Sequence, residues 1–471
     1  MRRDEATEKV NGGLDQAQAQ ARAAAGGQGR NILFLYGAIT TYTNTIYEYV
    51  DAFHRYSGFR TFFANLDQDT DFDVDLSLFD AVAIHYSVRL PFDQISESAA
   101  EALSRYQGLK YLFIQDEYDH TRRAWHWIRR LGIQLVFSVV PQAGVATVYP
   151  PQEFPGVRFV SVLTGYVSEH MDTGGAFAPP STRSLMVGYR GRPLPVRYGQ
   201  LGFDKVEVGR LVKAYCQARG IACDIAWTEE QRIYGPAWYD FMASCRSMLG
   251  CESGSNVFDW DGDLQHKLAQ LRDKGGRVDE RQAYERLVRP LEIPGLMNQV
   301  SPRVFEAIAA GTVLVLFEGN YSGVIEPWKH YIPLAKDGSN LDQVFDKLAD
   351  DAFVDAMARR AYEDVIASGR FSYRQFVQRV DAEVEASLQA LPARATAPSP
   401  GRGAALVLST APLRSQPPMI YQAFMRLPAS WSAALRSIHR RAYPLWCKLP
   451  RPLRMVLKPP LKLAVILLKR R

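Results

Sequence analysis

The segment from Ser301 to Thr312 combines residues whose types and spacing could bind a phosphate-bearing ligand. Ser301 suits a helix N-cap whose hydroxyl accepts a hydrogen bond, Pro302 suits the first turn, and Gly311 suits the left-handed residue that ends the helix. Free amides and the positive dipole end at such an N-terminus favour an anion such as a diphosphate. Glu306, one turn later, could accept two hydrogen bonds from a ribose diol, or could be a solvated acid that the dipole favours.

A second group of polar residues follows apolar runs in the N-terminal half, where strands would end. His85 follows AVAI and could orient a donor or acceptor hydroxyl, although a single histidine after a strand is more often structural. Asp116, in QDEYDH at 115–120, could supply a base, although acidic loops are usually solvated. The candidates for the acceptor side are Gly37, Thr41, Asn44 and Glu117.

The sequence offers no metal or cofactor site. The five cysteines form no CxxC pair and have no histidine at zinc spacing, which favours unpaired, buried thiols in a reducing compartment. The acids near Asp116 do not complete a Mg²⁺ or Mn²⁺ ligand set. No GxGxxG fingerprint follows a first strand, which disfavours an NAD-dependent enzyme. We therefore predict no metal and no cofactor.

The elements that would position these residues form two similar series. Short apolar runs alternate with helical patterns, which predicts an α/β chain with two doubly wound, Rossmann-like domains facing a cleft. The expected strands are Asn31–Tyr36, Thr61–Ala64, Ala81–His85, Tyr111–Ile114, Leu135–Val140, Arg158–Val162, Leu185–Tyr189, Cys223–Trp227, Ser247–Gly250 and Thr312–Phe317.

The length of 471 residues suits two or three domains. The predicted divisions are a disordered leader (1–30), an N-terminal acceptor domain (31–167), a C-terminal donor domain (184–350) with an insertion (263–300), closing helices (351–390), a linker (391–405) and a basic helical tail (406–471).

The run SPRVFEAIAAGTVLVL (301–316) resembles the donor-binding helix of GT-B glycosyltransferases of the retaining glycogen-synthase type. It is more similar to the bacterial glycosyltransferase family 1-like domain, which includes CgeB-like proteins and in which this helix commonly reads S/N-x-R-x-F-E. The continuation GNYSGVIEPWKHYIPL (319–334) fits the same group. The resemblance covers roughly residues 184–390 well and implies a GT-B fold, a nucleotide-sugar donor, retention and no metal.

The resemblance also implies roles for single residues. An Arg and a Lys from the region of GYRGR (188–192) hold the donor diphosphate in the resembling enzymes, which favours Arg190 and Lys205 here, although most basic residues are ordinary surface charges. Ser301, Arg303, Glu306 and Gly254 complete the predicted donor-binding set.

The sequence departs from the family at one position. The family places a first Glu about two turns before the second, and Asn298 stands there in this chain. The best substitute is Glu252 in LGCESGSN (249–256), directly after a strand, which by analogy would contact the donor sugar. An ordinary loop acid is the other interpretation of Glu252.

The charge is unevenly distributed. Residues 386–471 hold 15 Lys and Arg and no acid, whereas the remainder holds 41 Lys and Arg against 50 Asp and Glu, a net charge of −9. Basic residues among Trp, Tyr and Leu suit an anionic membrane surface, where each basic residue near the surface contributes about 1 kcal/mol of binding free energy. Nucleic acid competes as a partner because polycations bind phosphate, but the apolar share favours lipid; a tail without a partner is the third possibility.

These observations favour a nucleotide-sugar-dependent transferase of surface polysaccharide or glycoconjugate synthesis, acting on a carbohydrate or lipid-linked acceptor. A catalytically silent GT-B-like module that binds nucleotide or glycan at a membrane surface is the alternative, and Asn298 keeps it open. The sequence shows no secretory signal, and no apolar run approaches the ~20 residues that a membrane-spanning helix needs. We therefore expect a cytoplasmic protein that is peripheral at the inner membrane face.

Overall fold

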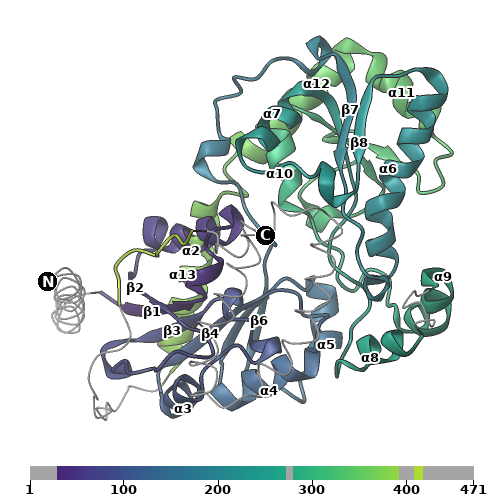
Figure 1. Cartoon of the computed structure of the whole chain (residues 1–471). Helices are drawn as coiled ribbons and strands as arrows, with labels where there is room; N and C mark the ends of the chain where they lie inside the picture. The colour runs from purple at the N-terminus through teal and green to yellow at the C-terminus, as the bar shows by residue number, and fades with distance from the viewer. Residues whose placement is uncertain (1–28, 272–278, 392–407, 417–471) are drawn as a thin grey trace, which may run out of the picture.

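The computed structural model describes residues 29–271, 279–391 and 408–416, which form two parallel sheets covered by helices (Figure 1). The first sheet has six strands in the order β2-β1-β3-β4-β5-β6, and the second has five in the order β11-β10-β9-β7-β8. The predicted fold class, α/β with two doubly wound Rossmann-like domains, is confirmed. The predicted tail lies outside the described residues except for 408–416.

The strands are β1 (Asn31–Tyr36), β2 (Arg60–Asn65), β3 (Ala81–Ile84), β4 (Leu109–Ile114), β5 (Leu135–Ser138), β6 (Arg158–Ser161), β7 (Leu185–Arg190), β8 (Cys223–Ala226), β9 (Cys245–Gly250), β10 (Val313–Phe317) and β11 (Tyr331–Leu334). The α-helices are α2 (Asn44–Tyr56), α3 (Glu97–Arg105), α4 (Thr121–Leu131), α5 (Val145–Val148), α6 (Gly199–Arg219), α7 (Pro236–Ser244), α8 (Asp263–Gln270), α9 (Glu280–Ala283), α10 (Pro302–Ala309), α11 (Leu341–Ala349), α12 (Asp351–Ala361) and α13 (Tyr373–Ala390).

The strands read as apolar runs because helices bury both faces of a parallel sheet. All six residues of β1 and of β4 are buried. The core of the first domain is rich in aromatic rings. The Phe113 ring stacks on the Phe137 ring with 5.0 Å between their centres, and it lies 5.3 Å from the centre of the Phe53 ring of α2. These strands were predictable from the sequence because burial on both faces leaves a continuous apolar run.

The edge strand β11 was missed by the sequence analysis. Its residues, YIPL, include Pro333, and a proline lowers the expectation of a strand because it cannot donate to the ladder. The structure puts β11 at the edge of the second sheet, paired only with β10, where a missing donor is tolerated. All four of its residues are buried.

The chain returns to the first domain after completing the second (Figure 1). Helix α13 packs on α2, and its Phe376 belongs to the first domain's core. The two segments that connect the domains run side by side. Val167 N–H donates to the Phe371 carbonyl at 2.8 Å, and Tyr373 N–H donates to the Val167 carbonyl at 3.0 Å. The first domain therefore includes sequence from both sides of the second.

Two further pieces complete the described chain. The insertion carries α8 and α9, which form a small lobe beside the second domain and share an apolar cluster with Val196 and Val257 of that domain (Figure 1). Residues 408–416 cover the β2 edge of the first sheet, where Phe63 and Ser409 exchange backbone hydrogen bonds of 2.7 and 3.0 Å. None of the helices in the described ranges is both long and apolar enough to cross a bilayer.

Candidate functional site

The order of the second sheet defines where a ligand would bind. Strand β7 lies between β8, which follows it in sequence, and β9, so the direction of winding reverses between β7 and β9. Ligands of open α/β sheets bind outside the carboxyl ends of the strands at such a reversal. Arg190 ends β7, and the loop that begins at Cys251 follows β9. Several predicted donor-binding residues therefore lie at this switch point.

Helix α10 opens at the same place and faces the first domain. The side chain of Gln299 donates to the carbonyl of Val139, and the Thr164 hydroxyl donates to the carbonyl of Val300 at 2.7 Å. Ser301 occupies the N-cap position, but its hydroxyl makes no cap hydrogen bond, so that detail of the prediction is wrong. In the described chain Pro302 has no N–H and the Val304 N–H donates to the Ser301 carbonyl at 2.9 Å, which leaves the Arg303 amide as the first-turn donor without an acceptor.

Glu306 lies one turn into α10 and is half-buried. Its Oε2 accepts a hydrogen bond from the indole N–H of Trp238 at 2.8 Å. Burial raises the pKa of Glu306, while the bond from Trp238 and the nearby charge of Arg303 oppose the rise. Arg303 lies over the Trp238 ring at 5.2 Å and donates to the carbonyl of Arg190 at 2.7 Å. A carboxylate and a cation therefore flank one aromatic ring.

Lys205 brings a second cation to the switch point. Its ammonium group donates to Ser253 Oγ at 3.1 Å and to the carbonyl of Glu252 at 3.3 Å. Ser253 in turn exchanges backbone hydrogen bonds of 2.7 and 2.9 Å with Gln299, two residues before the N-cap of α10. Lys205 is therefore connected through one residue to the opening of α10.

Arg190 has partners within the protein. Its guanidinium donates to the Asp224 carboxylate at 2.6 Å and to the Asp224 carbonyl at 2.9 Å, and it lies 4.3 Å from the centre of the Phe241 ring. Its Nε is buried and has no hydrogen-bond partner in the described chain, and contact of Arg190 with a phosphate stays a prediction. The sequence could not reveal this pairing because Asp224 comes from a neighbouring strand.

Glu252 is buried and supports the loop after β10. Its Oε1 accepts from the amides of Asn320 at 3.1 Å and Tyr321 at 2.8 Å, and its Oε2 accepts from the Asn298 side chain. Glu252 therefore touches the residue that replaces the family's first Glu. Gly254 is needed for the backbone, since its φ is +96° and a Cβ would come 2.0 Å from the carbonyl oxygen of Met297. Direct contact of either residue with a donor stays a prediction.

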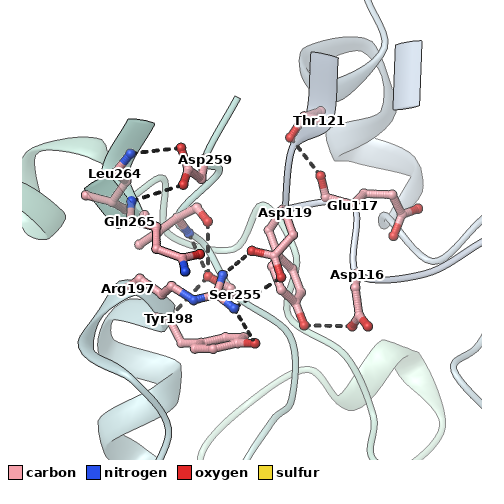
Figure 2. Close-up of polar contacts among 12 residues, drawn as sticks. Asp116, Glu117, Asp119, Thr121, Arg197, Tyr198, Ser255, Asp259, Leu264 and Gln265 are labelled. Atoms are coloured by element: carbon pink, nitrogen blue, oxygen red, sulfur yellow. Dashed lines mark hydrogen bonds and ion pairs between the residues drawn. The ribbon is translucent and has the colours of Figure 1, made fainter. Parts of the chain in front are cut away.

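A cavity of about 300 Å³ lies at the carboxyl ends of β3 and β4 in the first domain. Both predicted catalytic residues of this domain, His85 and Asp116, line it. His85 is fully buried, and burial lowers its pKa to about 3, so the ring is neutral and is a poor proton acceptor. Asp116 is exposed, and its Oδ1 accepts from the Tyr118 hydroxyl at 2.7 Å (Figure 2).

The four predicted acceptor-side residues serve internal contacts. Gly37 N–H donates to Ser87 Oγ at 2.8 Å. Thr41 and Asn44 contact residues 413–415 of the C-terminal segment. Glu117 is fully buried and points away from Asp116 (Figure 2), and its Oε1 accepts from Ser138 Oγ at 2.6 Å. None of the four lines the cavity, whereas Thr40, between β1 and α2, and Ile46, in α2, do.

The cavity and the opening of α10 are connected. The Gln115 side chain, in the cavity wall, donates to the carbonyl of Thr164 at 3.2 Å, and Thr164 donates to Val300. Two hydrogen bonds thus lead from the N-terminal cavity to the residue before Ser301. The described residues hold no group of three or more His, Cys, Asp or Glu side chains arranged for a metal ion.

No protein-family model matches the chain, and no curated protein matches it by sequence. Among solved structures, an alpha-glucosyltransferase in complex with UDP and a 13-mer DNA containing an HMU base is 10% identical, with 76% of this chain and 99% of that chain covered and a TM-score of 0.44. Anabaena HepE in complex with UDP is 13% identical, with coverages of 76% and 100% and a TM-score of 0.42. The DNA-modifying beta-glucosyltransferase is 13% identical, with coverages of 76% and 98% and a TM-score of 0.36. At these values the substrates of those proteins do not transfer to this chain.

Sequence reasoning missed two residues that complete the site. Trp238, which binds Glu306, lies in α7 among apolar residues, where a tryptophan is normally part of a core. Ser253, which binds Lys205, is one serine in a short loop. Neither carries a local signal, because each acquires its role from a contact with a distant segment.

Proposed function

We propose that this chain is a glycosyltransferase that moves a sugar from a nucleotide-sugar donor to a hydroxyl group of a glycan or lipid-linked acceptor, with retention, in surface polysaccharide or glycoconjugate synthesis. One observation carries the proposal. The opening of α10, with Glu306 one turn inside, faces the first domain and is connected through Thr164 and Gln115 to a cavity that holds Asp116. A donor site and an acceptor site would be adjacent in this arrangement.

The residues divide the chemistry between them. The Arg303 amide in the first turn of α10, with the side chains of Lys205 and Arg303, would bind the diphosphate and stabilise the charge that it gains on leaving. Glu306, oriented by Trp238, would accept the ribose hydroxyls. The bond from the anomeric carbon to the diphosphate oxygen breaks, the acceptor oxygen bonds to that carbon, and the acceptor proton goes to the leaving diphosphate or to Asp116.

Glu306 gives the direct test. Replacing Glu306 by Ala removes two hydrogen bonds to a charged acceptor, each worth about 1.5–3 kcal/mol, so nucleoside diphosphates should bind at least roughly 100-fold more weakly. Calorimetry with a panel of nucleoside diphosphates measures binding, and hydrolysis of a panel of nucleotide sugars measures turnover.

The exposed Glu326, elsewhere on the second domain, provides a matched control as Glu326→Gln. Its binding and turnover should equal those of the unaltered chain. The assignment fails if Glu306→Gln and Glu306→Ala both keep full turnover of a donor that the unaltered chain uses.

A silent binding module is the second candidate function. Glu252 and Asn298 bind each other, and Asn298 Oδ1 also accepts from the side-chain amide of Asn256 at 2.7 Å, so both residues have partners inside the protein. Calorimetric binding of a nucleotide without turnover of any donor would favour this candidate.

The proposal includes an anionic membrane surface as a partner of the basic C-terminal region, most of which lies outside the described residues. Within residues 408–416, the Ser415 hydroxyl donates to the Ile39 carbonyl at 3.2 Å, and Leu413 and Ile39 are 57% and 63% exposed. Flotation with anionic liposomes should be lost in a chain that ends at residue 416. That end point keeps the segment that binds the first domain, and equal flotation of both chains would remove the membrane partner.

A further inference from the structure

The loop between β4 and α4 has an unusual backbone conformation beside the cavity. Asp116 and His120 have φ values of +57° and +52°, in the left-handed region that non-glycine residues rarely adopt. Such a conformation persists only where surrounding contacts hold it. Because Asp116 lines the cavity, the contacts that hold this loop decide where its carboxylate points.

The second domain supplies one of these contacts through Arg197, in the turn before α6. Arg197 forms an ion pair with Asp119 (Figure 2), and the two side chains are only 20% and 11% exposed. Arg197 also donates to the Tyr198 hydroxyl at 3.0 Å, with its guanidinium 4.4 Å from the centre of that ring. Removing one partner of a pair this buried leaves an uncompensated charge, so the contact strongly favours the docked loop.

Backbone hydrogen bonds reinforce the docking. Asp259 N–H donates to the carbonyl of Tyr118 at 2.8 Å, and Arg122 N–H donates to the carbonyl of Trp260 at 2.9 Å. A second ion pair, between Arg122 and Asp261, lies at the rim, with side chains 59% and 48% exposed. The chain of the first domain is therefore attached to the second domain at Tyr118, Asp119 and Arg122.

Tyr118 transmits this attachment to the cavity. It is buried, its ring meets the Tyr198 ring edge-on at 5.5 Å, and its hydroxyl donates to Asp116 Oδ1 at 2.7 Å. A continuous series of contacts thus runs from Arg197 of the donor-side domain to Asp116 in the wall of the acceptor-side cavity.

We propose that Arg197 and Tyr118 are positioning residues for the acceptor. Arg197 keeps the loop docked on the second domain through Asp119, and Tyr118 aims the Asp116 carboxylate at the cavity. The acceptor site is then complete only while the two domains are joined at this loop. This inference rests on the proposed function, and it adds the contacts that align the acceptor hydroxyl.

Two variants separate the role of Tyr118 from that of Arg197. Tyr118→Phe removes only the hydroxyl that binds Asp116 and keeps the ring contact with Tyr198. It should lower transfer to a sugar acceptor about tenfold relative to donor hydrolysis, with nucleotide binding unchanged. Arg197→Ala should do the same and should also increase amide hydrogen exchange of residues 116–120. The probes are a panel of methyl glycosides as acceptors and water as the competing acceptor.

Arg122→Ala is the matched control, because it removes an ion pair of the same junction that does not reach Asp116. It should change neither the ratio of transfer to hydrolysis nor the exchange of residues 116–120. A purely structural role would instead lower transfer, hydrolysis and thermal stability together. The double variant Arg197→Ala/Asp119→Ala avoids the unpaired carboxylate and should restore stability without restoring transfer.

The outcomes are distinct. An unchanged ratio in Tyr118→Phe, or unchanged exchange of residues 116–120 in Arg197→Ala, overturns the proposal. If no nucleotide sugar is turned over by the unaltered chain, the proposed function falls. In that case the exchange experiment still decides whether Arg197 holds the loop.

Discussion

Neighbouring carboxyl groups in the loop after β4 have opposite surroundings. Asp116 is exposed at the cavity, whereas Glu117 is fully buried. Glu117 Oε1 accepts from Ser138 Oγ and from Val139 N–H at 3.2 Å, while its Oε2 has no hydrogen-bond partner in the described chain. Burial raises the pKa of Glu117 from 4.5 to about 8. The folded protein therefore keeps a proton there that the unfolded chain loses, and stability falls as pH rises between these values.

Glu117→Gln should remove this pH dependence, because an amide keeps the acceptor oxygen without ionising. Its free energy of unfolding should fall less between pH 5 and 8 than that of the unaltered chain, and at pH 8.5 it should be higher by about 1 kcal/mol or more. Urea unfolding across the pH range measures both. Glu153→Gln, at an exposed site, should reproduce the unaltered pH profile; parallel profiles for Glu117→Gln would contradict the prediction.

At the scale of elements, the segment 408–416 is an added part of the first domain. It covers the β2 edge and is bound at Thr41, whose hydroxyl donates to the carbonyl of Leu413 and accepts from Ser415 N–H, each at 2.9 Å. Covering an edge strand protects its unpaired backbone groups. Thr40, next to Thr41 in the chain, lines the cavity, so the segment supports one cavity wall.

Thr41→Val keeps the side-chain shape and removes the hydrogen bonds of the Thr41 hydroxyl to Leu413 and Ser415 of the segment, together with its bond to the Ala38 carbonyl. The change should lower the free energy of unfolding by about 1–3 kcal/mol and should speed proteolysis within residues 408–416. Thr43→Val is the control, since the Thr43 hydroxyl donates to the carbonyl of Thr40 and not to the segment. Equal proteolysis of the two variants would show that Thr41 does not hold the segment.

At the scale of the whole molecule, the first domain depends on sequence that follows the second. Phe376 of α13 packs at 5.0 Å from Tyr49 and 5.8 Å from Phe53 of α2. Phe376→Ala should lower the free energy of unfolding of the first domain by about 3–5 kcal/mol. It should lower the protection of β4 amides against hydrogen exchange while leaving β10 protected. Hydrogen exchange resolves the two sheets. Phe345→Ala, buried in the second domain's core, should show the opposite pattern, and loss of protection in both sheets would indicate one cooperative unit.

Local sequence determined the two parallel sheets and the helix that opens at Ser301. Apolar runs between helical patterns identify buried parallel strands, and the order Ser-Pro at the start and Gly at the end bounds α10, with Gly311 at φ +64° as expected. These signals are local, because burial on both faces and helix termini each leave a mark within a few residues. The short edge strand β11 lacked that mark.

Only the tertiary structure decided which side chains remain available. Arg190 is paired with Asp224, Glu252 with the loop after β10, and Thr41 with the C-terminal segment, all across long stretches of sequence. Trp238 and Arg197 acquire their roles in the same way, from segments that meet only in the fold. A residue type specifies which bonds a side chain can make, but the choice between an internal partner and a substrate depends on what the folded chain brings within about 3 Å of it.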